Sequence, residues 1–194
     1  MIKLSKVYKC FDRRVVLSDV SLSVSKNEFI CITGESGAGK TTLLNLIGLL
    51  DKPDSGEISI NEKNYFASKE ILKLRRNFFG YIFQDYLLME DKTVQDNLNI
   101  SKNIFKYENR RQDEKDINEI LEMVRLNPAY LNKKVYQLSG GEQQKVAIAR
   151  MLLKPYELAL ADEPTGNLDN RNKNEIIEIC KEIKKNGKTL ICVT

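Results

Sequence analysis

The sequence has no apolar run long enough to cross a membrane as a helix. Such a helix needs roughly 18 consecutive apolar residues, whereas the most apolar segment, residues 43–50, is short and is interrupted by Asn45 and Gly48. The first residues also lack the apolar core and small-residue cleavage site of a signal peptide. We therefore expect a cytosolic protein.

Histidine is absent, and cysteine is scarce. The four cysteines, Cys10, Cys31, Cys180 and Cys192, have no C-x-x-C spacing that would indicate a metal or redox motif. Cys31 and Cys192 lie inside apolar runs, where cysteine behaves as a small hydrophobic residue. We expect all four to be reduced core residues. The sequence also lacks an internal repeat, a low-complexity tract and a long Gly/Ser linker.

Composition and charge indicate an ordinary globular domain. Hydrophobic residues make up 42% and charged residues 30% of the 194 residues, unlike a disordered chain, and this length suits one compact domain. The net charge of +4 is gathered in local clusters instead of a continuous basic stripe with interleaved aromatics. We interpret the clusters as solvated surface and expect no nucleic-acid partner. They contain Lys73, Arg75, Arg76, Lys133 and Lys134.

Apolar runs of strand length, rich in β-branched residues, recur along the chain. Several are almost continuously apolar, which is typical of strands buried on both faces of a sheet. Helices are predicted at residues 41–50 and 171–185. The predicted strands cover residues 2–7, 20–24, 29–33, 58–60, 81–83, 158–161 and 189–193.

Residues 90–154 differ from the rest of the chain. They carry few strand signals, and apolar residues recur at helical spacing between residues 117 and 124. We predict a single domain in which residues 1–89 and 155–194 form an α/β core and residues 90–154 form an inserted helical subdomain.

A glycine-rich turn joins the predicted strand at residues 29–33 to the helix at 41–50. Its sequence, GESGAGKT, matches the phosphate-binding loop G-x-x-x-x-G-K-[ST]. Glycines allow backbone N–H groups to approach phosphate closely, and the helix dipole adds positive potential. A glycine-rich turn without a ligand would not explain why Lys40 and Thr41 stand at the required offsets. We expect Lys40 to reach the outer phosphates and Thr41 to meet Mg²⁺. The predicted nucleotide-binding residues of this loop are Gly34, Glu35, Ser36, Gly37, Ala38, Gly39, Lys40, Thr41 and Thr42.

Two adjacent carboxylates, Asp162 and Glu163, follow the apolar run at residues 158–161. The carboxyl end of a buried parallel strand is the ligand edge of such a sheet. Neighbouring carboxylates repel each other unless a cation or a proton transfer uses them. We assign Asp162 to Mg²⁺, through water, and Glu163 to a general base that polarises the attacking water. The alternative is a solvated pair at a strand end.

The segment LSGGEQQ at residues 138–144 has two interpretations. Ser139 and Glu142 fit an S-x-x-E capping box, and a helix follows. That interpretation leaves Gly140 and Gly141 unexplained, because each weakens a helix by roughly 1 kcal/mol and exposes N–H groups suited to an anion.

These three segments, in this order, resemble the ATP-binding cassette (ABC) ATPases, and the resemblance covers essentially the whole chain. It implies an ABC-type P-loop NTPase fold, with a mainly parallel α/β core, an antiparallel β subdomain and an inserted helical subdomain. The implied cofactors are ATP and Mg²⁺. The resemblance also implies a role for the start of the LSGGEQQ segment, which would bind the γ-phosphate of an ATP held by a second subunit. The residues concerned are Ser139, Gly140, Gly141 and Glu142.

Other positions gain a role only from the resemblance. Gln84 matches the family's Q-loop glutamine, which approaches the metal and the attacking water and links to the membrane partner. Residues 167–169 (Asn-Leu-Asp) match the D-loop at the dimer interface, although Asp169 could equally cap the following helix. Phe11 is the candidate for stacking on adenine, with Tyr8 as its substitute.

The function implied by the resemblance is ATP hydrolysis for a membrane exporter. Two copies would enclose two ATP molecules and drive a separate transmembrane permease at the cytoplasmic face of the membrane. Residues 51–56, 81–84 and 161–169 are most similar to the branch of macrolide exporters, lipoprotein-releasing ATPases and bacteriocin exporters.

Three other functions compete with export. An ABC ATPase acting on DNA or ribosomes is disfavoured, because the stretch between Gln84 and Ser139 is too short for a long coiled coil and no second cassette follows. A small-molecule kinase would explain neither the LSGGEQQ segment nor Glu163. A cell-division ATPase that transmits force through a membrane partner stays open.

One departure from the family concerns histidine. The family carries a switch histidine shortly after the strand predicted at residues 189–193, and this sequence has none. We expect a truncated chain instead of a degenerate ATPase, because Lys40, Asp162 and Glu163 are intact.

Overall fold

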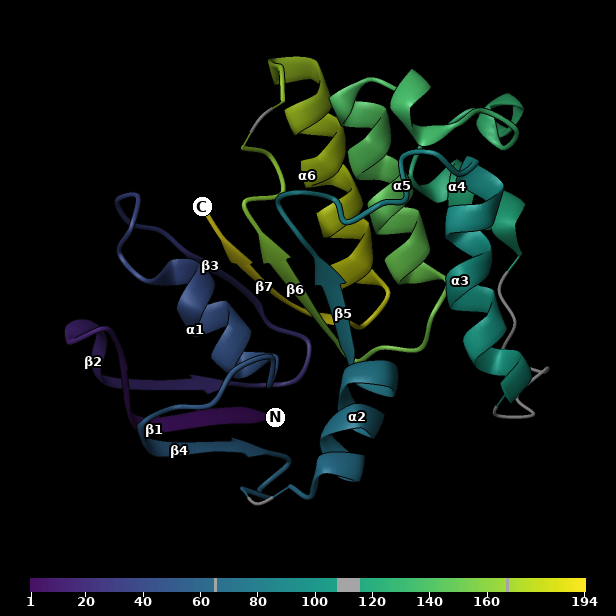
Figure 1. The fold of residues 1–194 in the computed structure, drawn as a ribbon. Coiled ribbons are helices and arrows are strands. Elements are labelled where there is room, and N and C mark those ends of the chain that lie inside the picture. The colour runs from purple at the N-terminus through teal and green to yellow at the C-terminus, as the bar shows by residue number, and fades with distance from the viewer. Residues whose placement is uncertain (65, 108–115, 167) are drawn as a thin grey trace.

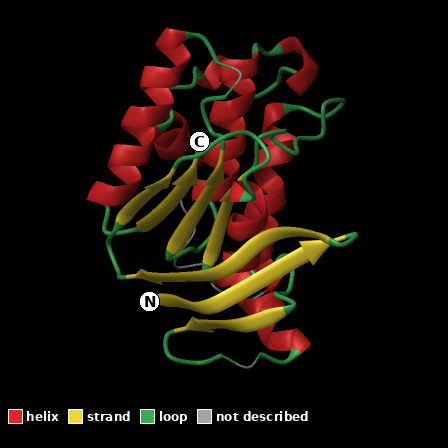
Figure 2. Ribbon diagram, turned by 90° about the vertical axis from the view of Figure 1, so that its left-hand side faces the viewer, coloured by secondary structure: helices red, strands yellow, loops and turns green. Residues whose placement is uncertain are grey.

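Two sheets frame the molecule. The computed structural model describes residues 1–64, 66–107, 116–166 and 168–194. A three-stranded antiparallel sheet has the order β2-β1-β4, and a four-stranded parallel sheet has the order β3-β7-β6-β5. Figure 2 shows the antiparallel sheet below the parallel one. The strands are β1 (Ile2–Phe11), β2 (Arg14–Val24), β3 (Phe29–Ile32), β4 (Ser55–Ile60), β5 (Phe79–Ile82), β6 (Leu158–Asp162) and β7 (Thr189–Val193).

Helices pack on both faces of the parallel sheet. Along β6, Leu158 and Leu160 belong to the apolar cluster that contains α1, whereas Ala159 and Ala161 belong to the cluster of α3, α4, α5 and α6. Strand side chains alternate between faces, so α1 and α5 lie on opposite faces, as Figure 1 shows. The helices are α1 (Lys40–Ile47), α2 (Ser68–Asn77), α3 (Val94–Tyr107), α4 (Ile117–Met123), α5 (Gly140–Leu152) and α6 (Asn170–Lys185), with 3₁₀ turns η2 (Pro128–Tyr130) and η3 (Val135–Gln137).

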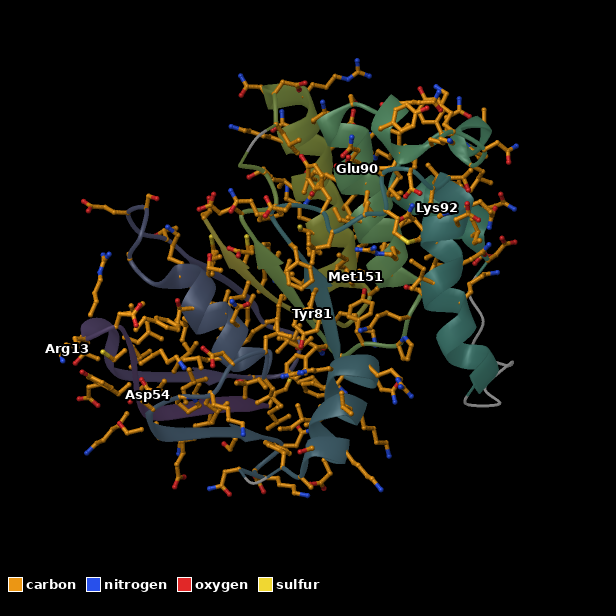
Figure 3. The ribbon with its side chains drawn as sticks, in the orientation of Figure 1. Arg13, Asp54, Tyr81, Glu90, Lys92 and Met151 are labelled. Atoms are coloured by element: carbon orange, nitrogen blue, oxygen red, sulfur yellow. The ribbon has the colours of Figure 1, made fainter. Side chains whose placement is uncertain are left out.

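The β1–β2 hairpin is longer than predicted. It closes where Phe11 pairs with Arg14, and both turn residues, Asp12 and Arg13, have positive φ angles of 45° and 70°. The predicted strand at residues 20–24 was therefore too short. Most of β2 before Val20 is exposed, so it lacks the continuous apolar run that indicated the other strands. Figure 3 shows Arg13 and Asp54 at the outer end of this sheet.

The parallel sheet is buried at its centre and open at one edge. Every residue of β6 and β7 is buried, as the continuous apolar runs predicted. Strand β3 lies at the edge of the described sheet, and its Phe29 and Cys31 are exposed. The expectation that all four cysteines are core residues is thus wrong for Cys31, and Cys10 is only half-buried. Cys180 and Cys192 are buried and free, as predicted.

Arg75 corrects the interpretation of its basic cluster as solvated surface. Its guanidinium donates two hydrogen bonds to the carbonyl of Leu49, one of them from Nε at 3.0 Å. Tyr81 donates its hydroxyl to the carbonyl of Gly48 at 2.5 Å, and Lys154 donates to the carbonyl of Arg75 at 2.9 Å. The bonds from Arg75 and Tyr81 satisfy carbonyls just beyond α1, and the bond from Lys154 satisfies a carbonyl in the last turn of α2. Helix α1 ends at Ile47 and not at the predicted residue 50. Helix α2, which carries Arg75, was not predicted.

Between residues 90 and 154 the described elements are helices and 3₁₀ turns. This segment shares one apolar cluster with β5, β6, β7 and α6. Its first residues run beside the chain before α5, because Tyr136 donates to the carbonyl of Glu90 and Val135 to that of Lys92. Both acceptor residues lie beside the upper helices in Figure 3. The division into core and subdomain stays a prediction. Among the helices of the described residues, none combines the length and the apolar character of a membrane span.

Candidate functional site

The glycine-rich loop lies at the carboxyl end of β3, where it begins α1. Residues 34–38 are exposed. Gly39 is the N-cap of α1 with φ 86°, and a Cβ there would lie 2.8 Å from Cγ1 and 3.0 Å from the carbonyl oxygen of Val16. Glycine therefore lets the helix begin against β2. At Gly37, φ is 78°, and no described atom lies within 4 Å of an added Cβ, which leaves room beside the loop for an anionic ligand.

Lys40 lies against the backbone of its own loop. Its ammonium donates to the carbonyls of Gly34 at 2.8 Å and Glu35 at 3.0 Å. The loop turns through a hydrogen bond from the amide of Ala38 to the carbonyl of Glu35 at 3.2 Å. The structure thus gathers the predicted loop residues, including the exposed Ser36 and the half-buried Thr42, around the start of α1.

A hydrogen bond joins the loop to the end of β6. The Thr41 hydroxyl donates to a carboxylate oxygen of Asp162 at 3.0 Å, across 121 positions of sequence. Hydroxyl and carboxylate oxygens are ligands that Mg²⁺ accepts in phosphate sites. No group of three or more metal-ligating side chains occurs within the described ranges. The pair therefore fits an ion shared with phosphate oxygens and water better than a metal centre built by protein alone.

Negative charge accumulates around Asp162. Burial raises the pKa of this carboxyl group above its ordinary value, and the charges of Glu163 and Asp85 raise it further. The hydrogen bond from Thr41 and the charge of Lys40 act in the opposite direction. A divalent cation beside Asp162 would offset the repulsion among the three carboxylates.

Glu163 has an unusual backbone conformation. Its φ is 41°, in the left-handed region that residues other than glycine seldom adopt. The Glu163 amide donates to the carbonyl of Val193 at 3.0 Å, which fixes the end of β6 to β7. Backbone strain of this kind collects at functional sites. The strain supports a functional role for Glu163 and does not by itself identify the role.

Gln84 follows β5, which pairs in parallel with β6 through Ile82 and Ala161. The carboxyl ends of the two strands therefore meet at one edge of the sheet. Gln84 and its neighbour Asp85 are both exposed there. Sequence reasoning missed Asp85; its position directly after Gln84 was the only signal.

The segment before α5 forms the capping box that the sequence offered as one interpretation. The Glu142 carboxylate accepts from the Ser139 amide at 2.7 Å and from the Ser139 hydroxyl at 2.9 Å. Gly141 is buried, and a Cβ there would lie 2.5 Å from the side chain of Asn172 on α6. Close packing of α5 on α6 thus explains Gly141, which the capping box alone left unexplained. Ser139 and Gly140 are exposed.

The remaining predicted residues that the structure describes lie on β1 and at the start of α6. Phe11 is 47% exposed near the end of the β1–β2 hairpin, with the Lys9 ammonium 5.0 Å from its ring centroid. Tyr8 is half-buried. Asp169 caps α6 by accepting from the Asn172 amide at 2.8 Å, so its capping role is confirmed. Asn167 lies outside the described residues.

A hollow of about 720 Å³ lies at the other end of α1, away from the phosphate loop. Its mixed polar and apolar lining comes from residues 49–53, which follow α1, from β4, from residues 64 and 66, and from α2. The residues that line this hollow include none of the phosphate loop and neither Asp162 nor Glu163.

The site consists of a strand, a glycine-rich loop and a helix, with a hydrogen bond from the helix to a carboxylate at the end of another strand of the same sheet. This arrangement defines a P-loop nucleotide-binding protein. Residues 17–166 match the family model described as ABC transporter. The chain belongs to the ABC transporter family and is an ATP-binding, ATP-hydrolysing domain of that family.

Two relatives illustrate the family. The ABC transporter ATP-binding protein MJ0796 of Methanocaldococcus jannaschii is 40% identical over 204 residues, covering 100% of this chain and 86% of the relative. The macrolide export ATP-binding/permease protein MacB of Chlorobaculum tepidum is 39% identical over 198 residues. That match covers 100% of this chain but only 30% of MacB.

Solved structures confirm the fold. A dimeric structure of MJ0796, described as an ABC transporter cassette, has a TM-score of 0.87 at 39% identity and covers 100% of this chain and 88% of that one. A second dimeric structure of MJ0796, bound to ADP and Pi after hydrolysis, has a TM-score of 0.86 at 38% identity, with the same coverage. The predicted ABC-type α/β fold is therefore confirmed.

Proposed function

We propose that this domain hydrolyses ATP with Mg²⁺ to power export through a membrane permease. The observation that carries the catalytic part of the proposal is the hydrogen bond between Thr41 and Asp162. It brings the end of the phosphate loop to the carboxylate edge of the sheet, where a nucleotide-bound cation needs oxygen ligands.

Each residue at this edge has a distinct role in the proposal. Lys40 neutralises charge on the outer phosphates, and Thr41 and Asp162 hold Mg²⁺, which would polarise the transferred phosphoryl group. Glu163 accepts a proton from the attacking water. Gln84 approaches the metal and orients that water from the end of β5.

We propose further that two copies close around two ATP molecules. Helix α5 lies on the opposite face of the parallel sheet from α1, and its exposed first residues, Ser139 and Gly140, are available to a second subunit. MJ0796 forms a dimer in its solved structures. In this arrangement the amides at the start of α5 contact the γ-phosphate held by the partner subunit.

The transport role rests on the relatives. MacB is named as an ATP-binding/permease protein, and this chain spans 30% of its length. We propose a transmembrane permease partner for this chain, which would lie at the cytoplasmic face of the membrane. Its contact would lie near Gln84 and residues 86–90, where Leu87 and Met89 are 56% and 39% exposed. The macrolide, peptide, bacteriocin or lipoprotein cargo would be selected by that permease.

The decisive experiment uses Glu163→Gln, which keeps the size of the side chain and removes the base. Wild-type protein and the variant are compared for ATP hydrolysis and for dimer formation in size-exclusion chromatography with ATP and Mg²⁺. We expect the variant to bind ATP, to lose hydrolysis and to accumulate as a dimer. Unimpaired hydrolysis would refute the role of Glu163, and a variant that binds ATP as a monomer would refute the two-ATP dimer.

A further inference from the structure

The turn that follows Gln84 has a strained backbone. Tyr86 and Leu87 have consecutive positive φ angles of 57° and 48°, and neither is glycine. Side chains with a Cβ disfavour the left-handed region, so other contacts must hold two such residues in succession. Inside the turn, the Leu87 amide donates to the carbonyl of Asp85 at 2.5 Å. The Tyr86 amide donates to the carbonyl of Phe83 at 3.2 Å. Further hydrogen bonds come from another element of the chain.

Arg150 on α5 supplies these contacts. Its Nη1 donates to the carbonyl of Leu87 at 2.7 Å, and its Nη2 donates to the carbonyl of Tyr86 at 3.0 Å. Both carbonyls belong to the strained residues, and the planar guanidinium has the fixed fork needed to bond two acceptors at once. Burial lowers the pKa of Arg150, which is consistent with a side chain committed to this contact.

The same turn also contacts the beginning of α5. A Cβ added to Gly140 would lie 3.3 Å from the hydroxyl oxygen of Tyr86, so the Tyr86 ring extends to the first residue of the helix. In Figure 1 the chain after β5 crosses α5 on its way to α3. Tyr86 therefore contacts the first residue of α5, and its carbonyl is bonded by Arg150, ten positions further along the helix.

We propose that Arg150 is a positioning residue that ties the turn at residues 84–87 to α5, so that the Gln84 end of β5 and the exposed start of α5 move as one unit. The inference rests on the proposed function, in which Gln84 serves the subunit's own nucleotide and the start of α5 serves the partner's. A rigid tie between them would let the state of one nucleotide affect the position of the segment offered to the other.

A residue on the same helix provides the matched control. Lys145 is 7% exposed, forms an ion pair with Glu175 and donates to the carbonyl of Arg125 at 3.3 Å. Within the part of the chain that the structure describes, these hydrogen bonds lead to α6 and to the residues after α4, and not to the turn at residues 84–87. Lys145→Met removes a buried positive charge from α5, and Arg150→Met removes a half-buried one. The lysine variant leaves the turn's hydrogen bonds intact.

The first measurement is independent of hydrolysis. Hydrogen exchange is followed by mass spectrometry in wild type, Arg150→Met and Lys145→Met without nucleotide. We expect Arg150→Met to accelerate exchange at residues 85–89 and at the start of α5 together, and Lys145→Met to leave residues 85–89 protected. Equal exchange at residues 85–89 in the two variants would overturn the proposal.

The second measurement separates kcat from KM for ATP, with rates corrected for folded fraction. We expect Arg150→Met to lower kcat roughly tenfold, since a misplacement of about 1 Å can cost up to about 100-fold, and to leave KM within about twofold because Lys40 and Thr41 are untouched. Arg150→Lys, which bonds one carbonyl, should recover part of the loss. Lys145→Met should lower thermal stability while kcat of the folded protein stays near wild type. A loss of kcat that is equal in the two methionine variants would contradict a specific role for Arg150.

A third variant tests the strained turn itself. Leu87→Gly makes a left-handed conformation readily accessible, so the Arg150→Met/Leu87→Gly double variant should regain protection at residues 85–89 and part of kcat. A double variant no better than Arg150→Met would refute the view that Arg150 holds the strained conformation. If wild-type protein hydrolysed no ATP, the proposed function would fail, while the exchange result would still decide whether Arg150 ties the turn to α5.

Discussion

The phosphate loop and the start of α5 are both helix N-termini rich in glycine, yet they are built differently. The loop is completed by long-range contacts, because Thr41 bonds to Asp162 across 121 positions and Gly39 packs against Val16. The cap of α5 is local, because Ser139 and Glu142 bond to each other within one turn, and the long-range contact there, between Gly141 and Asn172, packs the helix against α6.

In the proposed function, this difference separates a site assembled within the subunit from a surface that a second subunit would contact. At the loop, Thr41 and Asp162, the proposed oxygen ligands of the cation, are already hydrogen-bonded to each other. At α5, the cap satisfies the helix, but Ser139 and Gly140 stay exposed, on the opposite sheet face from α1. Substitutions in the two regions should therefore fail in different ways.

The largest effect is expected at the loop. Lys40→Ala removes the ammonium that lies against the carbonyls of Gly34 and Glu35, and we expect hydrolysis to fall by about 10²- to 10³-fold. Binding of a fluorescent ATP analogue by the monomer should weaken as well. Unchanged hydrolysis would show that the loop is not the nucleotide site.

A change at α5 should separate binding from turnover. Ser139→Arg places a bulky charge on the exposed surface, so we expect monomer binding to stay within about threefold and hydrolysis to fall by about 10²-fold. Ser139→Ala is the control, because it removes only the cap at a cost of about 1 kcal/mol. Loss of binding by the Ser139→Arg monomer would indicate that α5 serves its own nucleotide. Equal turnover in both variants would indicate that only the cap matters.

Gly141 tests the internal side of α5. Gly141→Ala places a Cβ against Asn172, and we expect unfolding free energy to fall by about 1–3 kcal/mol in urea denaturation. Adding Asn172→Ala should return part of the loss, because the neighbour of the new methyl group is then smaller. Strictly additive effects would show that this contact does not explain the glycine.

The smallest effect concerns pH and lies outside both regions, at Lys154, which follows the carboxyl end of α5 and donates to the carbonyl of Arg75. Burial lowers the pKa of Lys154 to about 8, from 10.5. Between about pH 8 and pH 10.5, Lys154 binds a proton in the unfolded chain but has released it in the folded protein. The free energy of unfolding therefore rises as the pH increases from about 8 to 10.5. Lys154→Met should flatten that rise in urea titrations. Exposed Lys184 provides the control variant Lys184→Met, and identical slopes in both variants would contradict the assignment.

Sequence reasoning did well where the signal is local. The match at residues 34–41 needs only consecutive residue types, and the buried runs of β6 and β7 needed only continuous apolar character. It failed where the burial or the hydrogen bonding of a residue depends on neighbours that are distant in sequence. Cys31 lies in an apolar stretch of sequence, but it is exposed because its strand is at the edge of the described sheet. Arg75 belongs to a basic cluster in the sequence, but its guanidinium is hydrogen-bonded to the carbonyl of Leu49.

The sequence by itself determined the family, the ABC-type fold and the candidate residues, because glycine spacing, adjacent carboxylates and apolar periodicity are properties of short segments. Only the tertiary structure decided which of these residues meet. Three contacts join residues that are distant in sequence: Thr41 with Asp162, Gly141 with Asn172, and Arg150 with the turn after Gln84. Such contacts depend on how helices and strands pack together, and residue order along the chain does not encode these distances directly.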